Sequence, residues 1–480
     1  MARTHDRGWR PARPADGPLI GHAAQPLLDL GIFSFIGVGL AAPFALSLGY
    51  IWISIFRPQA IAYTILPSIP VSLIMGALAV GWYLLRDRRS PPHFSPVLGM
   101  MAAMAAWVTL TTAVFAVAPD SAWEKWDWAF KTIVFSGFMV FVFRSRIQIE
   151  ALLQVLLFSF AAHFLPVGIK VVLSGGGYGQ ALGLIGGNSG FGEGATLAAV
   201  ALMCIPIALF LAKHNRLMPA WPIVRLGYIG MAGLAVMATI GTYQRTGLVG
   251  LVVLAITFWV RSRQKLLVGT GLGIGAIVFA LSVSSNWAER MSTISEYQSE
   301  GSALGRILVW QWTLGFVANN PFGGGFHSYM INEFTSQPTP EYPNGYTVRG
   351  KAFHSIYFEA LGEHGWIGLG LFLAINIATL LSLQRVIRRT RGSEALAWCR
   401  DLAAALQVSL LVLLACGAFI GIAFQPMFWY LFAASGCLSH HVGRAFAPDV
   451  AARRQQALGA GVGTRGNAIA ARPWRGAAGG

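Results

Sequence analysis

The chain has 480 residues, of which 55% are hydrophobic and 11% are charged, and its formal net charge at pH 7 is +16. Because charged residues make up roughly a quarter of a soluble globular domain, this composition excludes an ordinary soluble protein and indicates a polytopic membrane protein. The positive charge gathers in short loops between apolar runs, which is typical of a topogenic signal and predicts no binding to nucleic acid.

Apolar runs long enough to cross a bilayer, roughly 17 to 25 residues each, recur about 12 times along the chain. Leucine, valine, alanine and glycine fill them without period-two alternation, which favours helices over barrel strands. The predicted fold is therefore all-α, with about 12 transmembrane helices. The runs lie near residues 28–56, 67–85, 96–118, 127–143, 149–173, 194–212, 221–241, 246–260, 266–285, 354–383, 402–423 and 426–443.

Every second loop is rich in arginine and lysine, and short basic loops remain in the cytoplasm. We therefore divide the chain into a cytoplasmic leader (1–26), transmembrane helices 1–9 (27–285), an extracytoplasmic loop (286–353), transmembrane helices 10–12 (354–444) and a disordered cytoplasmic tail (445–480). The first apolar run is expected to remain as an uncleaved anchor, because the loop parity requires it as a span. The four cysteines lie in or beside membrane and cytoplasmic segments, so no disulfide framework or zinc cluster is expected.

The loop over 286–353 is a long polar and aromatic insertion between apolar runs. Apolar residues over 304–316 recur near helical spacing, which predicts an amphipathic helix on the membrane surface with Arg306 at headgroup level. A glycine-rich turn at 320–325 follows, and the chain re-enters the membrane from His354. A cationic side chain at a water–membrane boundary suggests binding of an anionic headgroup, and a histidine there suggests proton transfer.

Two arginines are candidates for binding phosphate. A guanidinium group makes bidentate, charge-assisted hydrogen bonds to phosphate oxygens. Arg245 follows an apolar run at the expected external side, where arginine is disfavoured; the alternative is that it snorkels to lipid headgroups. For Arg306 the alternative is a charge at the rim of the loop, paired with Glu300.

His354 is the best candidate for a general base, because an ordinary imidazole pKa is about 6.5. Its alternative is a hydrogen-bonded interfacial residue. His327, in the flexible glycine turn, is a weaker candidate base. Ser355 and Tyr357 are candidate orienting groups, although a tyrosine here also suits the aromatic belt of a membrane protein.

Glu359 and Glu363 stand one helical turn apart near the expected external interface, where they either bind an acceptor or orient the basic residues. No Walker A sequence, H-E-x-x-H motif or D-x-D motif occurs, so we expect no cofactor, no metal and no sugar nucleotide. The glycine run over 269–275 lies inside an apolar run and indicates close helix packing. The residues expected to contact substrate are Gln244, Arg349, Lys351, Tyr357 and Glu363.

These motifs resemble those of the O-antigen ligase family of bacterial membrane glycosyltransferases, and also those of O-antigen polymerases and protein O-oligosaccharyltransferases. Residues 245–247 resemble the family's external arginine–glycine turn, 305–325 its loop helix and turn, and 354–368 its histidine motif. Residues 118–127 resemble the branch of O-glycosylation ligases associated with exosortase-type export systems. The likeness covers most of residues 28–443.

The resemblance implies a GT-C-like fold and transfer of a preassembled glycan from undecaprenyl diphosphate to an acceptor hydroxyl of lipid A core, a protein Ser or Thr, or a surface glycan. The reaction is expected at the outer face of the bacterial inner membrane, without metal and with inversion. Arg245 and Arg306 are expected to clamp the diphosphate, and His354 to accept the acceptor proton. Two positions depart from the family pattern and concern donor binding, namely the segment 192–195 and Gln244.

Two alternatives remain open from the sequence. A polymerase of the same family would extend a glycan and would carry the same motifs. A secondary transporter or flippase would also have about 12 spans, but it tends to bury ionisable residues near mid-membrane and to contain two related halves. The sequence has few charges within its apolar runs and no evident repeat.

Overall fold

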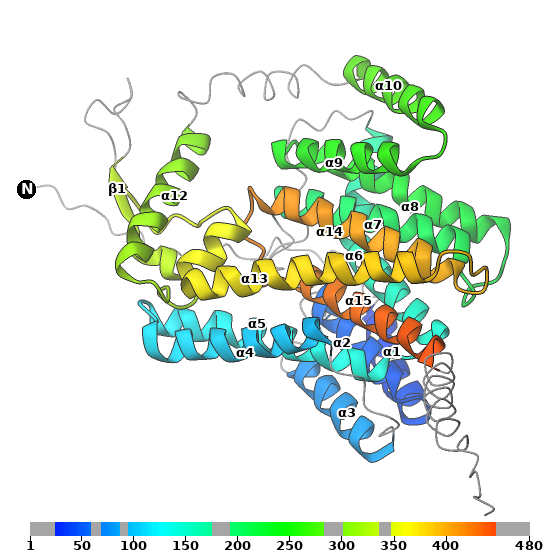
Figure 1. Cartoon of the computed structure of the whole chain (residues 1–480), viewed down its shortest axis with the longest axis horizontal. Helices are drawn as coiled ribbons and strands as arrows, with labels where there is room; N and C mark the ends of the chain where they lie inside the picture. Colours follow the sequence, from blue (N-terminus) through cyan, green and yellow to red (C-terminus); the bar gives the residue numbers. More distant parts are fainter. Residues whose placement is uncertain are drawn as a thin grey trace, which may run out of the picture.

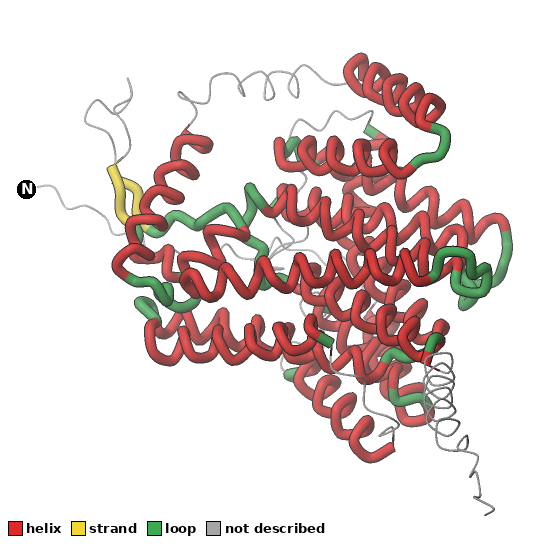
Figure 2. The backbone as a smooth tube through the Cα atoms, in the orientation of Figure 1, coloured by secondary structure: helices red, strands yellow, loops and turns green. Residues whose placement is uncertain are grey.

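The computed structural model describes residues 25–58, 69–86, 95–174, 193–282, 301–335 and 347–447, and these residues are built almost entirely from α-helices (Figures 1 and 2). The leader and the tail expected at the two ends lie mostly outside the described residues, as does the glycine-rich segment 175–192. The helices are α1 (Gln25–Ala41), α2 (Phe44–Phe56), α3 (Val71–Arg86), α4 (Pro96–Phe115), α5 (Pro119–Val142), α6 (Arg146–Leu173), α7 (Gly194–His214), α8 (Pro222–Gly241), α9 (Arg245–Arg261), α10 (Lys265–Ser282), α12 (Gly301–Asn319), α13 (Ile356–Arg389), α14 (Ala397–Gly417) and α15 (Pro426–Ala445).

Six of these helices are long and apolar enough to cross a membrane, namely α4, α6, α7, α8, α13 and α14. Each coincides with one of the apolar runs identified in the sequence, so the helical membrane-protein class is confirmed. Helices α2 and α3 are apolar but shorter. The total of about 12 spans stays a prediction.

The first apolar run, expected as one span over 28–56, is divided into two helices. Helix α1 ends before Pro43 and α2 begins after it, because proline has no backbone N–H to continue the helical bonding. The two helices fold back on each other, with Gly31 against the ring of Trp52 and Gly49 against Phe35. This antiparallel hairpin corrects the single span expected for that run.

The basic loops come together at one end of the bundle, as the charge pattern predicts. Arg146 donates to the carbonyl oxygen of His214 at 3.2 Å, and Lys213 pairs with Asp401 at 2.7 Å. Arg444, at the end of α15, donates to the carbonyl oxygen of Arg144. We call this end, where α7 meets α8 and α13 meets α14, the basic end.

The predicted long loop contains regular structure at the opposite end (Figure 1). The helix expected over 304–316 is present as α12, which packs against α13. A 3₁₀ turn (Ser328–Ile331) and the hairpin of β1 (Glu333–Thr335) and β2 (Thr347–Arg349) follow. Residues 286–300, which include Glu300, and 336–346 lie outside the described residues, and the position of α12 on a membrane surface stays a prediction.

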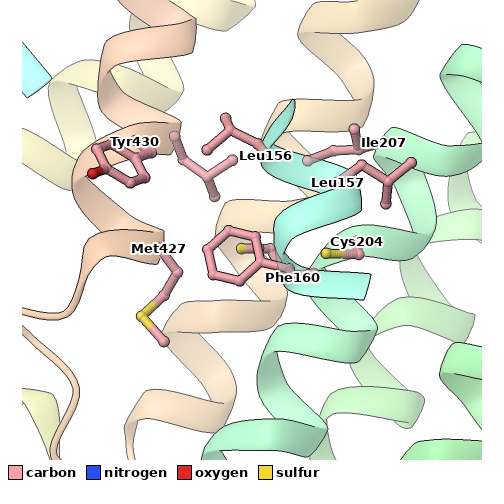
Figure 3. Close-up of a pocket in the computed structure, with 9 residues that line it drawn as sticks. Leu156, Leu157, Phe160, Cys204, Ile207, Met427 and Tyr430 are labelled. Atoms are coloured by element: carbon pink, nitrogen blue, oxygen red, sulfur yellow. The ribbon is translucent and has the colours of Figure 1, made fainter. Parts of the chain in front are cut away.

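Between the two ends, the core is tightly packed. A cavity of only about 10 Å³ lies among α6, α7 and α15, lined by side chains that include Phe160, Cys204 and Met427 (Figure 3). Such a volume holds at most one water molecule, so the bundle has no apolar binding chamber at this place. All four cysteines are buried and free, as expected.

Candidate active site

The glycine-rich turn after α12 is seated on a kink in α13. Gly365 departs from helical geometry with φ at 67°, and the backbone N–H of Trp366 donates to the carbonyl oxygen of Pro321 at 3.1 Å. Gly323, with φ at 81°, lies so close that a Cβ atom there would come within 2.5 Å of the Glu363 carbonyl oxygen. Only glycine fits both positions, because each combines a left-handed conformation with direct backbone contact.

A buried ion cluster lies beneath this turn and joins α5 to α13. The Nζ atom of Lys125 lies 2.7 Å from Glu359 Oε1 and 2.9 and 3.0 Å from the two oxygens of Glu363. Glu359 also accepts from the backbone N–H of Ala423 at 2.9 Å, and Glu363 from that of His327 at 2.9 Å. We call Lys125, Glu359 and Glu363 the buried ion cluster; its net charge is −1 when all three groups are ionised.

Glu363 was expected to contact substrate, and its side chain is fully buried. Its carboxylate oxygens already bind Lys125 and the backbone N–H of His327, so Glu363 links α13 to α5 and to the glycine-rich turn. This agrees with the alternative in which Glu363 orients basic residues. A contact with substrate stays a prediction. The role of Lys125 was not predicted from the sequence, although a signal for it exists. A lysine amid tryptophans near an apolar run needs an acidic partner, and two carboxylates one turn apart offer one.

His364 is enclosed beside the cluster. Its Nδ1 atom lies 2.7 Å from the hydroxyl of Thr111, and the Trp107 indole N–H donates to its carbonyl oxygen at 2.9 Å. The rings of Phe326 and Phe424 lie edge-on to the imidazole, with centroids at 4.4 and 5.0 Å. With no exposed surface, His364 is unsuited to meet a substrate and instead ties α13 to α4.

His354, Arg306 and Lys351 come together where α12 meets the start of α13. The Trp310 indole N–H donates to the Phe353 carbonyl oxygen at 2.8 Å and fastens α12 to the segment that carries His354. Burial lowers the pKa of His354, and the positive charges of Arg306 and Lys351 lower it further. The imidazole is therefore neutral near pH 7, which is the state that accepts a proton.

The backbone holds these groups in place. His354 has a φ of 49°, a left-handed conformation that is uncommon for a residue with a side chain and that occurs often at functional sites. The Lys351 carbonyl oxygen accepts from the side-chain amide of Asn332 at 2.6 Å, and the Lys351 backbone N–H donates to the Asn332 side-chain oxygen at 2.9 Å. The Lys351 ammonium group lies against Gly305, where a Cβ atom would overlap it. Burial, followed by the charge of Arg306, lowers the pKa of Lys351.

Arg245 begins α9 at the same end of the bundle. The neighbouring Thr246 carbonyl oxygen accepts from the Cys416 thiol, and Tyr357 donates to the Leu414 carbonyl oxygen at 3.2 Å. The last turn of α14 thus separates the start of α9 from the start of α13. Arg306, Lys351 and His354 form one electrostatic group, and α14 packs against both α13 and α9, the helix that Arg245 begins.

The remaining expected residues lie around this group. Gln244 occupies the N-cap position of α9 without a capping hydrogen bond from its side chain, which lies against Gly194 at the start of α7. Arg349 is exposed on β2 and pairs with Glu333 at 2.8 Å, so it stands at the outer rim. Burial and the charge of Lys125 lower the pKa of His327 to about 4, and its Nδ1 atom lies 2.5 Å from the Ser121 hydroxyl. His327 is thereby held as a neutral partner of Ser121.

Two family models match the chain. One, described as O-antigen ligase, matches residues 230–373, and one described as a family of unknown function (DUF5935) matches residues 27–216. No curated protein matches the chain. Every residue predicted for the site lies within 230–373, whereas Lys125 lies within the other matched segment, so the buried ion cluster joins the two. In the described part of the chain no three His, Cys, Asp or Glu residues gather as a metal-binding group.

Proposed function

Because residues 230–373 place this chain in the O-antigen ligase family, we propose that it transfers a preassembled glycan from undecaprenyl diphosphate to an acceptor hydroxyl. The reaction takes place at the outer face of the bacterial inner membrane, opposite the basic end. The observation that carries the proposal is the placement of a neutral imidazole, His354, beside the cations Arg306 and Lys351. Such a group supplies a base together with positive charge for a phosphate.

His354 accepts the proton of the acceptor hydroxyl while that oxygen attacks the anomeric carbon of the donor sugar. The bond between the anomeric carbon and the phosphate oxygen breaks on the opposite face, so the configuration inverts. Undecaprenyl diphosphate leaves with an additional negative charge. Arg306 and Lys351 stabilise that charge together with Arg245, which begins α9.

Cationic side chains in this role replace a divalent metal. We expect purified protein to transfer glycan in EDTA at the rate measured with added Mg²⁺. An absolute requirement for metal would contradict the metal-free mechanism.

The acceptor is a hydroxyl of lipid A core, a protein Ser or Thr, or a surface glycan; extension of the glycan itself would make the protein a polymerase. Gly194 and Gln244, which belong to the two departures from the family pattern, contact each other, and this supports a shared role in donor binding. A comparison of glycan-bearing lipids and proteins in a deletion strain identifies the acceptor. Transport of a lipid-linked glycan across vesicles without a covalent product would instead favour a flippase.

A further inference from the structure

A cavity of about 540 Å³ lies at the basic end, between the last turn of α7 and the first turns of α8. Its walls include Lys213, Asn215, Trp221, Arg225 and Tyr228. The other end of α7, at Gly194, contacts Gln244 in the candidate active site. Because α7 has 21 residues and a helix rises 1.5 Å per residue, the cavity is about 30 Å from that site.

The turn that forms one wall is rigidly built. Glu150, on α6 and buried, accepts from the backbone N–H groups of Arg216 and Leu217 at 2.6 and 2.8 Å. The Asn215 side chain accepts from Gln154 at 3.0 Å and from the backbone N–H of Met218 at 3.0 Å. The cavity therefore exists before any ligand binds.

The charge around the cavity is positive. Arg225 is exposed and forms no ion pair within the described ranges, and Arg146 lies close enough to Arg216 for the two charges to repel. The acidic groups nearby are occupied: Asp401 pairs with Lys213 and His214, and Glu150 accepts backbone N–H groups. Helix α8 also begins here without a side-chain cap, so the positive end of its dipole adds to the field.

An apolar face beside the cations selects a lipid over a free anion, and a buried hydroxyl offers a hydrogen bond. Trp221, Ile223 and Leu226 are 64%, 65% and 61% exposed, which gives α8 an apolar outer face beside the cations. Tyr228 lines the cavity, and its hydroxyl is buried without a hydrogen-bond partner among the described residues. A buried hydroxyl without a partner costs free energy until an acceptor is supplied.

We propose that this cavity binds the headgroup of an anionic phospholipid in the leaflet at the basic end, expected to be cytoplasmic. The lipid phosphate meets Arg225 and accepts the Tyr228 hydroxyl, while the acyl chains lie along Trp221, Ile223 and Leu226. The site is separate from the proposed transfer reaction and does not depend on it. Basic pockets between helices at a cytoplasmic surface suit such headgroups.

The test is native mass spectrometry of the purified full chain in detergent, titrated with phosphatidylglycerol or with phosphatidylcholine of the same acyl chains. We expect preferential retention of phosphatidylglycerol, weakened roughly three- to tenfold by Arg225→Gln and by Tyr228→Phe. Arg263→Gln removes an exposed charge at the same end but outside the cavity lining, and it should leave retention unchanged.

Equal retention of the two lipids would overturn the proposal, as would an effect of Arg263→Gln as large as that of Arg225→Gln, because either result indicates unspecific charge attraction. Competition by millimolar glycerol phosphate as strong as by the lipid would assign the site to a soluble anion instead. Tyr228→Phe keeps the ring that stacks on Phe158 and removes a buried hydroxyl without a partner, so its unfolding temperature in lipid-free detergent should be at least as high as that of the unaltered protein. With that fold control met, unchanged phosphatidylglycerol retention by Tyr228→Phe would also contradict the proposal.

Discussion

Lys125→Met should destabilise the protein strongly, because Lys125 supplies the positive charge that partly offsets two buried carboxylates. The Glu359 and Glu363 side chains are 7% and 0% exposed, and three of their oxygens lie within 2.7–3.0 Å of the Lys125 Nζ atom. Removing one partner of a buried ion pair costs about 3–5 kcal/mol, since an uncompensated charge stays behind. We expect Lys125→Met to lower the free energy of unfolding by about this amount.

The same helix offers a matched control. Lys131 pairs with Asp127 at 2.6 Å, but both side chains are about half exposed, at 47% and 58%. An exposed pair contributes about 0–1 kcal/mol, so Lys131→Met should have little effect. The assay is thermal unfolding of both variants in one detergent, with hydrogen exchange of the turn at 321–327, which should open faster in Lys125→Met.

A triple variant separates charge from packing. Lys125→Met combined with Glu359→Gln and Glu363→Gln leaves no buried charge in the cluster and should recover a large part of the lost stability. Equal unfolding temperatures for Lys125→Met and Lys131→Met would refute the reasoning. A triple variant no more stable than Lys125→Met would show that contacts other than charge, such as the Lys125 contact with the Phe326 ring, dominate.

Three further outcomes are expected. His354→Ala should lower turnover at least about 100-fold in a glycan-transfer assay while donor binding stays near normal; near-normal turnover would remove its role as base. Lys351→Gln removes a positive charge that lowers the pKa of His354, so that pKa should rise and the acid limb of the pH–rate profile should move to higher pH. An unchanged acid limb would show that the charge of Lys351 does not act on the catalytic base. Gly365→Ala should destabilise the fold by about 1–3 kcal/mol, because a Cβ atom overlaps the Pro321 carbonyl oxygen at a left-handed position, whereas Gly370→Ala, with open space around it on the same helix, should be tolerated in the same unfolding measurement.

Much of the helical framework could be predicted from the sequence. The spans α6, α7 and α13 coincide with apolar runs, because burial in a bilayer demands a local excess of apolar side chains that can be counted along the chain. The helix α12 followed from the spacing of its apolar residues. The break at Pro43 had a local signal too, and it was missed because the run on either side of the proline is uniformly apolar.

The candidate site was predictable only in part. His354 and Arg306 stand out in the sequence as polar residues of the long loop and its end, and the charge of Arg306 lowers the pKa of His354 in the structure. Whether they act on a lipid diphosphate stays a prediction. The packing of the last turn of α14 against the starts of both α9 and α13 has no signal in the local sequence.

The sequence by itself determined the helical class, the alternation of basic and neutral loops and the position of the polar insertion, because hydrophobicity and charge act on each segment independently of its neighbours. Only the tertiary structure decided that Lys125 pairs with Glu359 and Glu363, which lie 234 and 238 positions away in the sequence. It also decided that α13 is kinked at Gly365, where the backbone of Pro321 packs against it. Those contacts depend on which helix faces pack together, and the packing of each face is set by all the helices of the bundle at once.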